Sequence, residues 1–124
     1  MLYIRNYLAK SPIENAGLGL YTSQLIKSGD LIWKMDEGLD IELMDLPTDE
    51  VKRDFVLKYG YIPLEGVKRW IICIDNAKYI NHSETPNTFD TYHMTTALYD
   101  IPAHTELTSD YRDFAVNPFE GWDI

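Results

Sequence analysis

The most informative part of this chain is residues 79–87, which read Tyr79-Ile80-Asn81-His82-Ser83-Glu84-Thr85-Pro86-Asn87. Asparagine, histidine, serine and proline stand here together, shortly after the apolar run that begins at Trp70. Because proline and the turn-forming residues around it prevent a simple strand, the sequence predicts that the chain bends here. Amide and imidazole groups carry both donors and acceptors, so they need hydrogen-bond partners wherever the bend is buried.

Two other segments stand out for their residue types. Glu106-Leu107-Thr108-Ser109-Asp110-Tyr111 is a polar, strand-like piece that ends in a tyrosine. Gly17-Leu18-Gly19-Leu20-Tyr21 lies near the N-terminus, and its glycines allow either a plain turn or a close approach to a ligand. Without a third glycine and a following helix, they do not form a dinucleotide-binding fingerprint. In chain order, the three segments resemble the SET-domain family of protein-lysine methyltransferases.

Length and composition indicate one globular domain. The chain has 124 residues, 45% of them hydrophobic and 25% charged, which is typical of a folded domain rather than a disordered one. It has no apolar run long enough to span a membrane and no signal-peptide pattern, so we expect an intracellular protein, cytoplasmic or nuclear. The single cysteine, Cys73, cannot form an internal disulfide or a cysteine-based zinc site.

The charge of the chain restricts its partners. A net charge of −9 repels a phosphate backbone, so direct binding of nucleic acid is not expected. The same charge attracts a basic peptide, although acidic surfaces also serve solubility alone.

The pattern of short apolar runs between turns predicts a mainly β domain. One helix is expected, with Thr48 as its N-cap, Val51, Phe55 and Tyr59 along one face, and Gly60 at its end. The expected strands are residues 19–22, 31–35, 39–44, 70–75 and 92–99, with brief pairing of residues 106–109.

The family resemblance implies a more specific fold. It predicts a SET-domain (β-clip-like) fold of several small curved sheets with one short helix, in which the C-terminal segment threads beneath an earlier loop. Residues 1–112 would form this domain. Residues 113–124 would pack over the cofactor and substrate site, with Phe114 or Trp122 covering an adenine.

The resemblance also implies a cofactor, S-adenosylmethionine. The string Asn81-His82-Ser83-x-x-Pro86-Asn87 looks like the family's cofactor motif, in which Asn87 would brace the loop. The family usually has a basic residue at position 78 and an aromatic one at position 79, and both types are present. The implied cofactor-binding residues are Gly17, Leu18, Gly19, Tyr21, Lys78, Tyr79, Asn81, His82 and Trp122.

Simpler explanations for the residues of this motif remain open. Asn81-His82-Ser83 also satisfies the N-glycosylation pattern, although nothing indicates secretion. His82 can also be a structural histidine with satisfied hydrogen bonds. His93 and His104 do not have metal-like spacing from His82, so no metal site is predicted.

Tyr111 is the predicted catalytic residue. A tyrosine after a strand usually serves packing, but Glu106-Leu107-Thr108-x-Asp110-Tyr111 resembles the family's Glu-Leu-Thr-x-x-Tyr segment, and the family gives that tyrosine the catalytic role. A phenol suits methyl transfer because it can orient a neutral amine in line with the methyl group. Aromatic walls would hold the lysine stem, and the candidates are Tyr59, Tyr61, Phe89 and Tyr92.

The resulting functional hypothesis is an S-adenosylmethionine-dependent protein-lysine N-methyltransferase that acts on a basic, lysine-containing protein or peptide. Two alternatives stay open, namely a SET-fold interaction module with little or no activity and a methyltransferase for a small molecule. A homodimer is also possible, since small stand-alone members of the family sometimes pair to complete the site.

Overall fold

The structure is a computed structural model that describes residues 1–65, 67–91 and 93–116. Its regular elements are short and are almost all strands. In chain order they are β1 (Asn6–Lys10), β2 (Leu18–Thr22), β3 (Leu31–Lys34), β4 (Ile41–Leu43), α1 (Glu50–Tyr59), β5 (Ile62–Pro63), β6 (Trp70–Ile72), the 3-10 helix η1 (Asn76–Tyr79), β7 (Asn81–His82), β8 (Thr88–Asp90), β9 (Met94–Ala97), β10 (Thr108–Ser109), the 3-10 helix η2 (Tyr111–Asp113) and β11 (Ala115–Val116).

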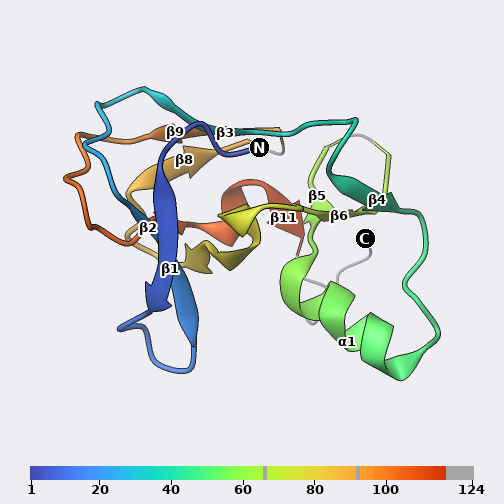
Figure 1. The fold of residues 1–124 in the computed structure, drawn as a ribbon. Coiled ribbons are helices and arrows are strands. Elements are labelled where there is room, and N and C mark those ends of the chain that lie inside the picture. The colour runs from blue at the N-terminus through green and yellow to red at the C-terminus, as the bar shows by residue number, and fades with distance from the viewer. Residues whose placement is uncertain (66, 92, 117–124) are drawn as a thin grey trace.

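The strands form several small sheets rather than one large sheet. The largest has the order β3-β9-β8 and is antiparallel, and the pairs β1–β2, β4–β6 and β5–β11 are antiparallel as well. In Figure 1 the β1–β2 hairpin lies on one side of the molecule and α1 on the other, with β11 between them. The prediction of a mainly β fold of small sheets with one α-helix is therefore confirmed for the described residues.

The C-terminal segment lies between two earlier parts of the chain. On one side β10 pairs in parallel with β7, so that Thr108 faces Asn81 across the ladder. On the other side the Leu107 N–H donates to the Leu20 carbonyl of β2 over 2.8 Å. A segment held from both sides in this way agrees with the crossing that the family resemblance implied.

The helix begins one residue later than predicted. Asp49, not Thr48, is the N-cap, and its carboxylate accepts a hydrogen bond from the Lys52 N–H over 3.0 Å. Aspartate and threonine are both competent caps, and the carboxylate also interacts favourably with the positive end of the helix. The predicted end is correct, because the Gly60 N–H donates to the Val56 carbonyl.

The predicted apolar face of the helix is wrong. Val51 is 79% exposed and Phe55 is 46% exposed, whereas Val56 is the buried residue of α1. The spacing of four was real, but Val56 is the residue of α1 buried with Trp70 and Ile72, and Tyr59 is the member of the predicted row that packs against the same cluster. The exposed row instead borders an apolar groove with β4.

Several strand boundaries also differ from the prediction. The expected strand 70–75 is only Trp70–Ile72, and the expected strand 92–99 is only Met94–Ala97 among the described residues. The prediction missed the strands β1, β5, β7, β8 and β11. These short strands lack a clear alternation of their own, so pairing defines them, with a neighbouring strand for β1 and β8 and with a distant one for β5, β7 and β11.

Two apolar clusters support the fold. The larger one lies under the β1–β2 hairpin and β3, and the smaller one joins α1 to β5 and β6. The larger contains Ile4, Leu20, Ile26, Ile32, Trp33, Cys73, Ala77, Ala97, Ile101 and Leu107. The smaller contains Val56, Ile62, Trp70 and Ile72.

Truncation of Leu107 should destabilise the domain strongly. Leu107 is fully buried and lies in the segment that crosses between β2 and β7. We expect Leu107→Ala to lower the free energy of unfolding by about 2–5 kcal/mol, because it leaves a cavity in a packed core. Chemical denaturation measures this, with the exposed Leu98→Ala as the matched control. Equal losses in the two variants would contradict the assigned core.

Candidate active site

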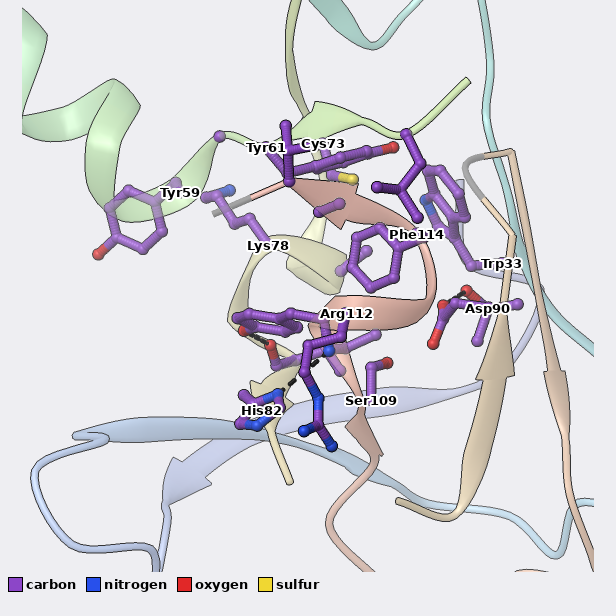
Figure 2. Close-up of a pocket in the computed structure, with 18 of the residues that line it drawn as sticks. Trp33, Tyr59, Tyr61, Cys73, Lys78, His82, Asp90, Ser109, Arg112 and Phe114 are labelled. Atoms are coloured by element: carbon purple, nitrogen blue, oxygen red, sulfur yellow. Dashed lines mark hydrogen bonds between the residues drawn. The ribbon is translucent and has the colours of Figure 1, made fainter. Parts of the chain in front are cut away.

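A cavity of about 890 Å³ opens between the two sides of the domain. Its walls come from β3, the end of α1, η1, β8, β9 and the segment from β10 to β11. His82 and Tyr111, which are separated in sequence, lie on this cavity with their rings 5.3 Å apart. Figure 2 shows the labelled aromatic residues and His82 around the same space. A ligand pocket of this size can hold a nucleoside-sized molecule.

Tyr111 is held at both its backbone and its hydroxyl group. Its N–H donates to His82 Nδ1 over 3.1 Å, and its hydroxyl group donates to the Ile80 carbonyl. Desolvation, with added repulsion from Asp90 and Glu106, raises the pKa of Tyr111 to about 12. The phenol therefore stays protonated at neutral pH and acts as a neutral hydrogen-bonding group.

The hydrogen bond from the Tyr111 N–H also fixes the tautomer of neutral His82. Because Nδ1 accepts the Tyr111 N–H, the neutral imidazole carries its proton on Nε2. Asp110 lies 3.8 Å from this ring and is engaged by Arg112 through two hydrogen bonds of 2.6 and 2.8 Å. This pairing is the main cause that lowers the pKa of Asp110 to about 2. Asp110 also caps η2, so it fixes the turn that carries Tyr111.

Asn81 joins the Gly-x-Gly segment to the crossing strand. Its Nδ2 donates to the Leu18 carbonyl and to Glu106 Oε2, each over 3.0 Å. Gly19 lies directly beside this junction, since a Cβ on Gly19 would come within 2.2 Å of Glu106 Oε2. Gly17 adopts a left-handed φ of 75°, which favours glycine. The structure therefore brings together the three segments that the sequence analysis singled out, residues 17–21, 79–87 and 106–111.

Strand β2, which contains Leu18 and Gly19, also carries Tyr21. Its ring stacks on Tyr7 with 5.5 Å between centroids, and its hydroxyl group donates to the Lys10 carbonyl. Like Gly17, Leu18, Gly19 and Asn81, Tyr21 is not part of the cavity wall. These residues form a junction next to the wall that His82 and Tyr111 provide.

Substitution of Gly19 should disturb this junction. In Gly19→Ala the new methyl group must displace the Glu106 carboxylate, which breaks its hydrogen bond to Asn81. We expect a loss of about 0.5–1.5 kcal/mol in the free energy of unfolding, the usual contribution of one such bond. Thermal denaturation measures it, with Gly38→Ala as the control, because a Cβ there makes only an ordinary contact. Unchanged stability in Gly19→Ala would contradict the assigned junction.

Asn87 braces the bend, as predicted. Its Nδ2 donates to the Glu106 carbonyl over 2.8 Å, and its Oδ1 accepts from the Thr108 N–H over 2.9 Å. Both partners belong to the crossing segment that leads to Tyr111. The buried amide thus ties the bend to the C-terminal segment through the backbone.

Only some of the described aromatic residues that were expected to bind substrate line the cavity. Tyr59 and Tyr61 line the cavity, whereas Phe89 is exposed and lies outside the wall. Phe114, from the expected covering tail, contacts both Tyr61 and Tyr111, with 5.1 and 5.8 Å between ring centroids. Tyr92 and Trp122, the other two predicted site residues in this part, lie outside the described residues.

The basic and aromatic pair that precedes the bend lies on η1. Lys78 lines the cavity, and its Nζ lies 5.3 Å from the centroid of the Tyr79 ring. Tyr79 packs edge-on against Tyr59 with 5.5 Å between centroids and is not itself part of the wall.

Sequence reasoning missed the polar floor of the cavity. Asp90, Thr95 and Ser109 line it from the sheet, together with Trp33 and Cys73. The sequence of β8, Thr88-Phe89-Asp90, gave no such signal, because its two polar residues are buried and its aromatic residue is exposed. Burial raises the pKa of the Cys73 thiol to about 12, so this cysteine is not an activated nucleophile.

Two absences hold for the described residues. Within residues 1–65, 67–91 and 93–116, no group of histidine, cysteine or acidic side chains has the geometry to bind a metal ion. In the same ranges, no helix is long and apolar enough to cross a membrane.

The small sheets, the crossing segment and the His82–Tyr111 cavity define a β domain with a built ligand site. The chain belongs to the SET domain family, whose model matches residues 17–112. No curated protein matches the chain in sequence.

Solved structures agree with this family. Chaetomium thermophilum Polycomb Repressive Complex 2 bound to GSK126 matches with a TM-score of 0.67 and 27% identity, over 92% of this chain. The same complex in an autoinhibited conformation bound to S-adenosylmethionine matches with a TM-score of 0.65 and 24% identity, over 90% of this chain. In both cases the chain spans only 16% of the length of its relative.

A shorter relative matches over nearly its whole length. This is a proposed histone methyltransferase of Plasmodium falciparum, with a TM-score of 0.64 and 19% identity, over 89% of this chain and 95% of that one. At this identity the likeness concerns the fold. This likeness in fold agrees with the match to the SET domain family.

Proposed function

We propose that this protein transfers a methyl group from S-adenosylmethionine to the side-chain amine of a protein lysine. The observation that supports this most is the meeting of Tyr111 and His82 on one wall of a cavity that also has aromatic walls. The apolar stem of a lysine can pack against aromatic side chains, and its cationic nitrogen can interact with their faces.

The residues present fit S-adenosylmethionine, which supplies an electrophilic methyl group when bound. The cavity volume of about 890 Å³ leaves room for a nucleoside, and the Gly17–Gly19 segment and Asn81 lie at the junction next to its His82 wall. His82 has its Nδ1 occupied by the Tyr111 N–H, so its Nε2–H is the donor that the ring offers to a ligand. One solved relative is described as bound to this same molecule.

Tyr111 would orient the amine that receives the methyl group. Its phenol is neutral, is anchored through Ile80, and stands on the cavity wall beside His82. The amine nitrogen must be neutral when its lone pair forms the new bond to carbon and the carbon–sulfur bond breaks. A positioned hydroxyl group favours this in-line geometry.

The acidic character of the chain favours a basic protein as substrate. A net charge of −9 attracts lysine-rich segments and repels nucleic acid. An intracellular location and a homodimer remain predictions, and light scattering of the purified chain tests the second.

The central experiment combines cofactor binding and transfer. We expect S-adenosylmethionine at 100 times its Kd to stabilise the chain by about 2.7 kcal/mol, seen as a rise in Tm. Cell lysate incubated with methyl-labelled cofactor should then give labelled protein, with the label on lysine by mass spectrometry. The absence of both the Tm rise and the labelled protein would refute the proposal. A Tm rise and peptide binding without label would instead support the interaction module.

A further inference from the structure

Three residues of the cavity floor form one row of side chains across the largest sheet. Trp33 of β3 pairs with Thr95 of β9, and Thr95 pairs in turn with Asp90 of β8. Directly paired residues of antiparallel strands project to the same face, and all three residues line the cavity. In Figure 2 Trp33 and Asp90 stand on the same side of the space, away from His82.

Asp90 is a buried carboxylate with only neutral partners. It is 6% exposed and accepts hydrogen bonds from the Thr95 hydroxyl group and, over 3.2 Å, from the Thr88 hydroxyl group. The Thr88 hydroxyl group has one proton and also lies 2.8 Å from the Thr108 carbonyl, so it serves Asp90 only in part. Among the described residues, no lysine, arginine or histidine lies within 4.0 Å of this carboxylate.

A buried charge without a cation is unfavourable unless a ligand supplies one. Desolvation raises the pKa of Asp90, and the hydroxyl groups of Thr95, Ser109 and Thr88 offset this only in part. Other titratable and charged groups that face Asp90 or share its cavity come from every neighbouring element. They are Tyr111, Arg112 and Asp113 of η2, Lys58 and Tyr59 of α1, Tyr61 before β5, Cys73 after β6, Lys78 of η1, His82 of β7, and Glu84 after β7.

The other end of the row also has an unmet hydrogen-bonding group. The indole Nε1–H of Trp33 is buried and has no partner, and the side chain is only 4% exposed. Buried polar groups in folded proteins nearly always have a partner, so this donor is available to a ligand or to an ordered water. The Trp33 side chain lines the same cavity as the Asp90 carboxylate.

We propose that Asp90 binds the ammonium group of the substrate lysine and accepts its proton before methyl transfer. This rests on the proposed function and adds the substrate's ammonium subsite to it. The lysine enters as R–NH3⁺, one N–H bond breaks, and its proton moves to the Asp90 carboxylate to give R–NH2 and a carboxylic acid. The freed lone pair then forms the bond to the methyl carbon, and the electron pair of the carbon–sulfur bond stays on sulfur.

Burial of Asp90 favours this proton transfer. An ammonium–carboxylate pair at a buried position converts more readily to a neutral pair than it does in water, because two charges disappear. Thr95 and Ser109 hold the carboxylate in place but carry no charge, so they leave it free to accept a proton. Tyr111 remains the group that orients the amine, and Asp90 is the group that makes the amine neutral.

The test of binding uses Asp90→Asn and two small probes, n-butylammonium chloride and n-butanol. The amide keeps the size of the side chain and an acceptor for Thr95 but removes the charge. We expect the wild-type chain to bind n-butylammonium about tenfold more tightly than the variant does, with n-butanol nearly unchanged. Chemical-shift titration by NMR measures both. Asp40→Asn is the matched control, because Asp40 is also 6% exposed but bonds backbone N–H groups outside the cavity.

The test of proton transfer is the pH profile of kcat/KM on a labelled lysine protein. The wild-type enzyme takes the ammonium form, so its profile should be nearly flat from pH 7 to 9. The Asp90→Asn variant can use only lysine that is already neutral in solution. Its kcat/KM should therefore rise about tenfold per pH unit below the lysine pKa of about 10.4. Asp90→Ser supplies the same comparison if the amide variant does not fold.

The outcomes separate this inference from the proposed function. Equal n-butylammonium affinity in the wild type and Asp90→Asn would overturn the inference and leave the methyl-transfer proposal standing. Parallel pH profiles in the two proteins would do the same. A wild-type chain that transfers no methyl group but still prefers the ammonium probe through Asp90 would refute the proposed function and retain the ammonium site.

Discussion

Tyr111→Phe should lose most methyl transfer while keeping its affinity for S-adenosylmethionine. The variant removes only the hydroxyl group, which is neutral at working pH and anchored on the Ile80 carbonyl at the cavity wall. Removal of one positioned hydrogen-bonding group at a reacting centre lowers kcat by about 10²–10³-fold. Single-turnover measurement with labelled cofactor gives the loss, and the cofactor-induced rise in Tm gives the binding.

The matched control is Tyr7→Phe. Tyr7 also has a bonded hydroxyl group, at 3.0 Å from His104 Nδ1, but it stands on β1 away from the cavity. The two variants should lose similar stability, since each gives up one hydrogen bond of about 0.5–1.5 kcal/mol. Only Tyr111→Phe should lose turnover. Normal turnover in that variant would remove Tyr111 from the mechanism, and an equal loss in both would indicate a general effect on folding.

The site was predictable in part because its polar motifs are contiguous in sequence. The string that contains Asn81, His82 and Asn87 carries its own turn residues, so its bend and its need for partners could be inferred directly. Tyr111 could be placed near His82 only through the family resemblance, because a parallel pairing of β7 with β10 leaves no local trace in either strand. The hydrogen bond of the Tyr111 N–H to His82 is the physical link that the sequence does not display.

The floor of the cavity could not be predicted for a related reason. Asp90 meets Trp33 through Thr95 only because three strands pair in one particular register. A shift by one residue would turn Asp90 to the opposite face, so its burial is a property of the sheet rather than of the segment. The helix shows the same limit. Its spacing of four was read correctly, but the tertiary contacts of Val56 decided which face is buried.

The junctions between segments connect stability to activity in this small domain. Glu106 accepts from Asn81 with its side chain and from Asn87 with its backbone carbonyl, so one residue joins the Gly-x-Gly segment, the bend and the crossing segment. Two residues later the chain enters β10, and η2 with Tyr111 follows at once. A substitution at this junction should therefore change the geometry of the cavity, even though Asn81, Asn87 and Glu106 do not line it.

Asn87→Leu should be the most destabilising of the polar substitutions. It leaves the Glu106 carbonyl and the Thr108 N–H without their partner at a buried position. Each unsatisfied buried group costs about 1–3 kcal/mol, so the free energy of unfolding should fall by about 2–6 kcal/mol. Since whole domains have only about 5–15 kcal/mol, this loss is a large share of the total stability, and urea denaturation measures it. Asn76→Leu is the control, because Asn76 bonds only the side chain of Asn6.

Asn87→Asp distinguishes the donor from the acceptor. The carboxylate can still accept from the Thr108 N–H, but it repels the Glu106 carbonyl unless it is protonated. Burial and this repulsion should raise the folded-state pKa of the new acid above its unfolded value of about 3.9. The variant should then be most stable below pH 4 and lose stability as the pH rises through the folded pKa. Urea denaturation from pH 3 to 8, relative to the wild type, measures this trend, and a stability difference independent of pH would show that the Glu106 carbonyl does not depend on the Asn87 donor.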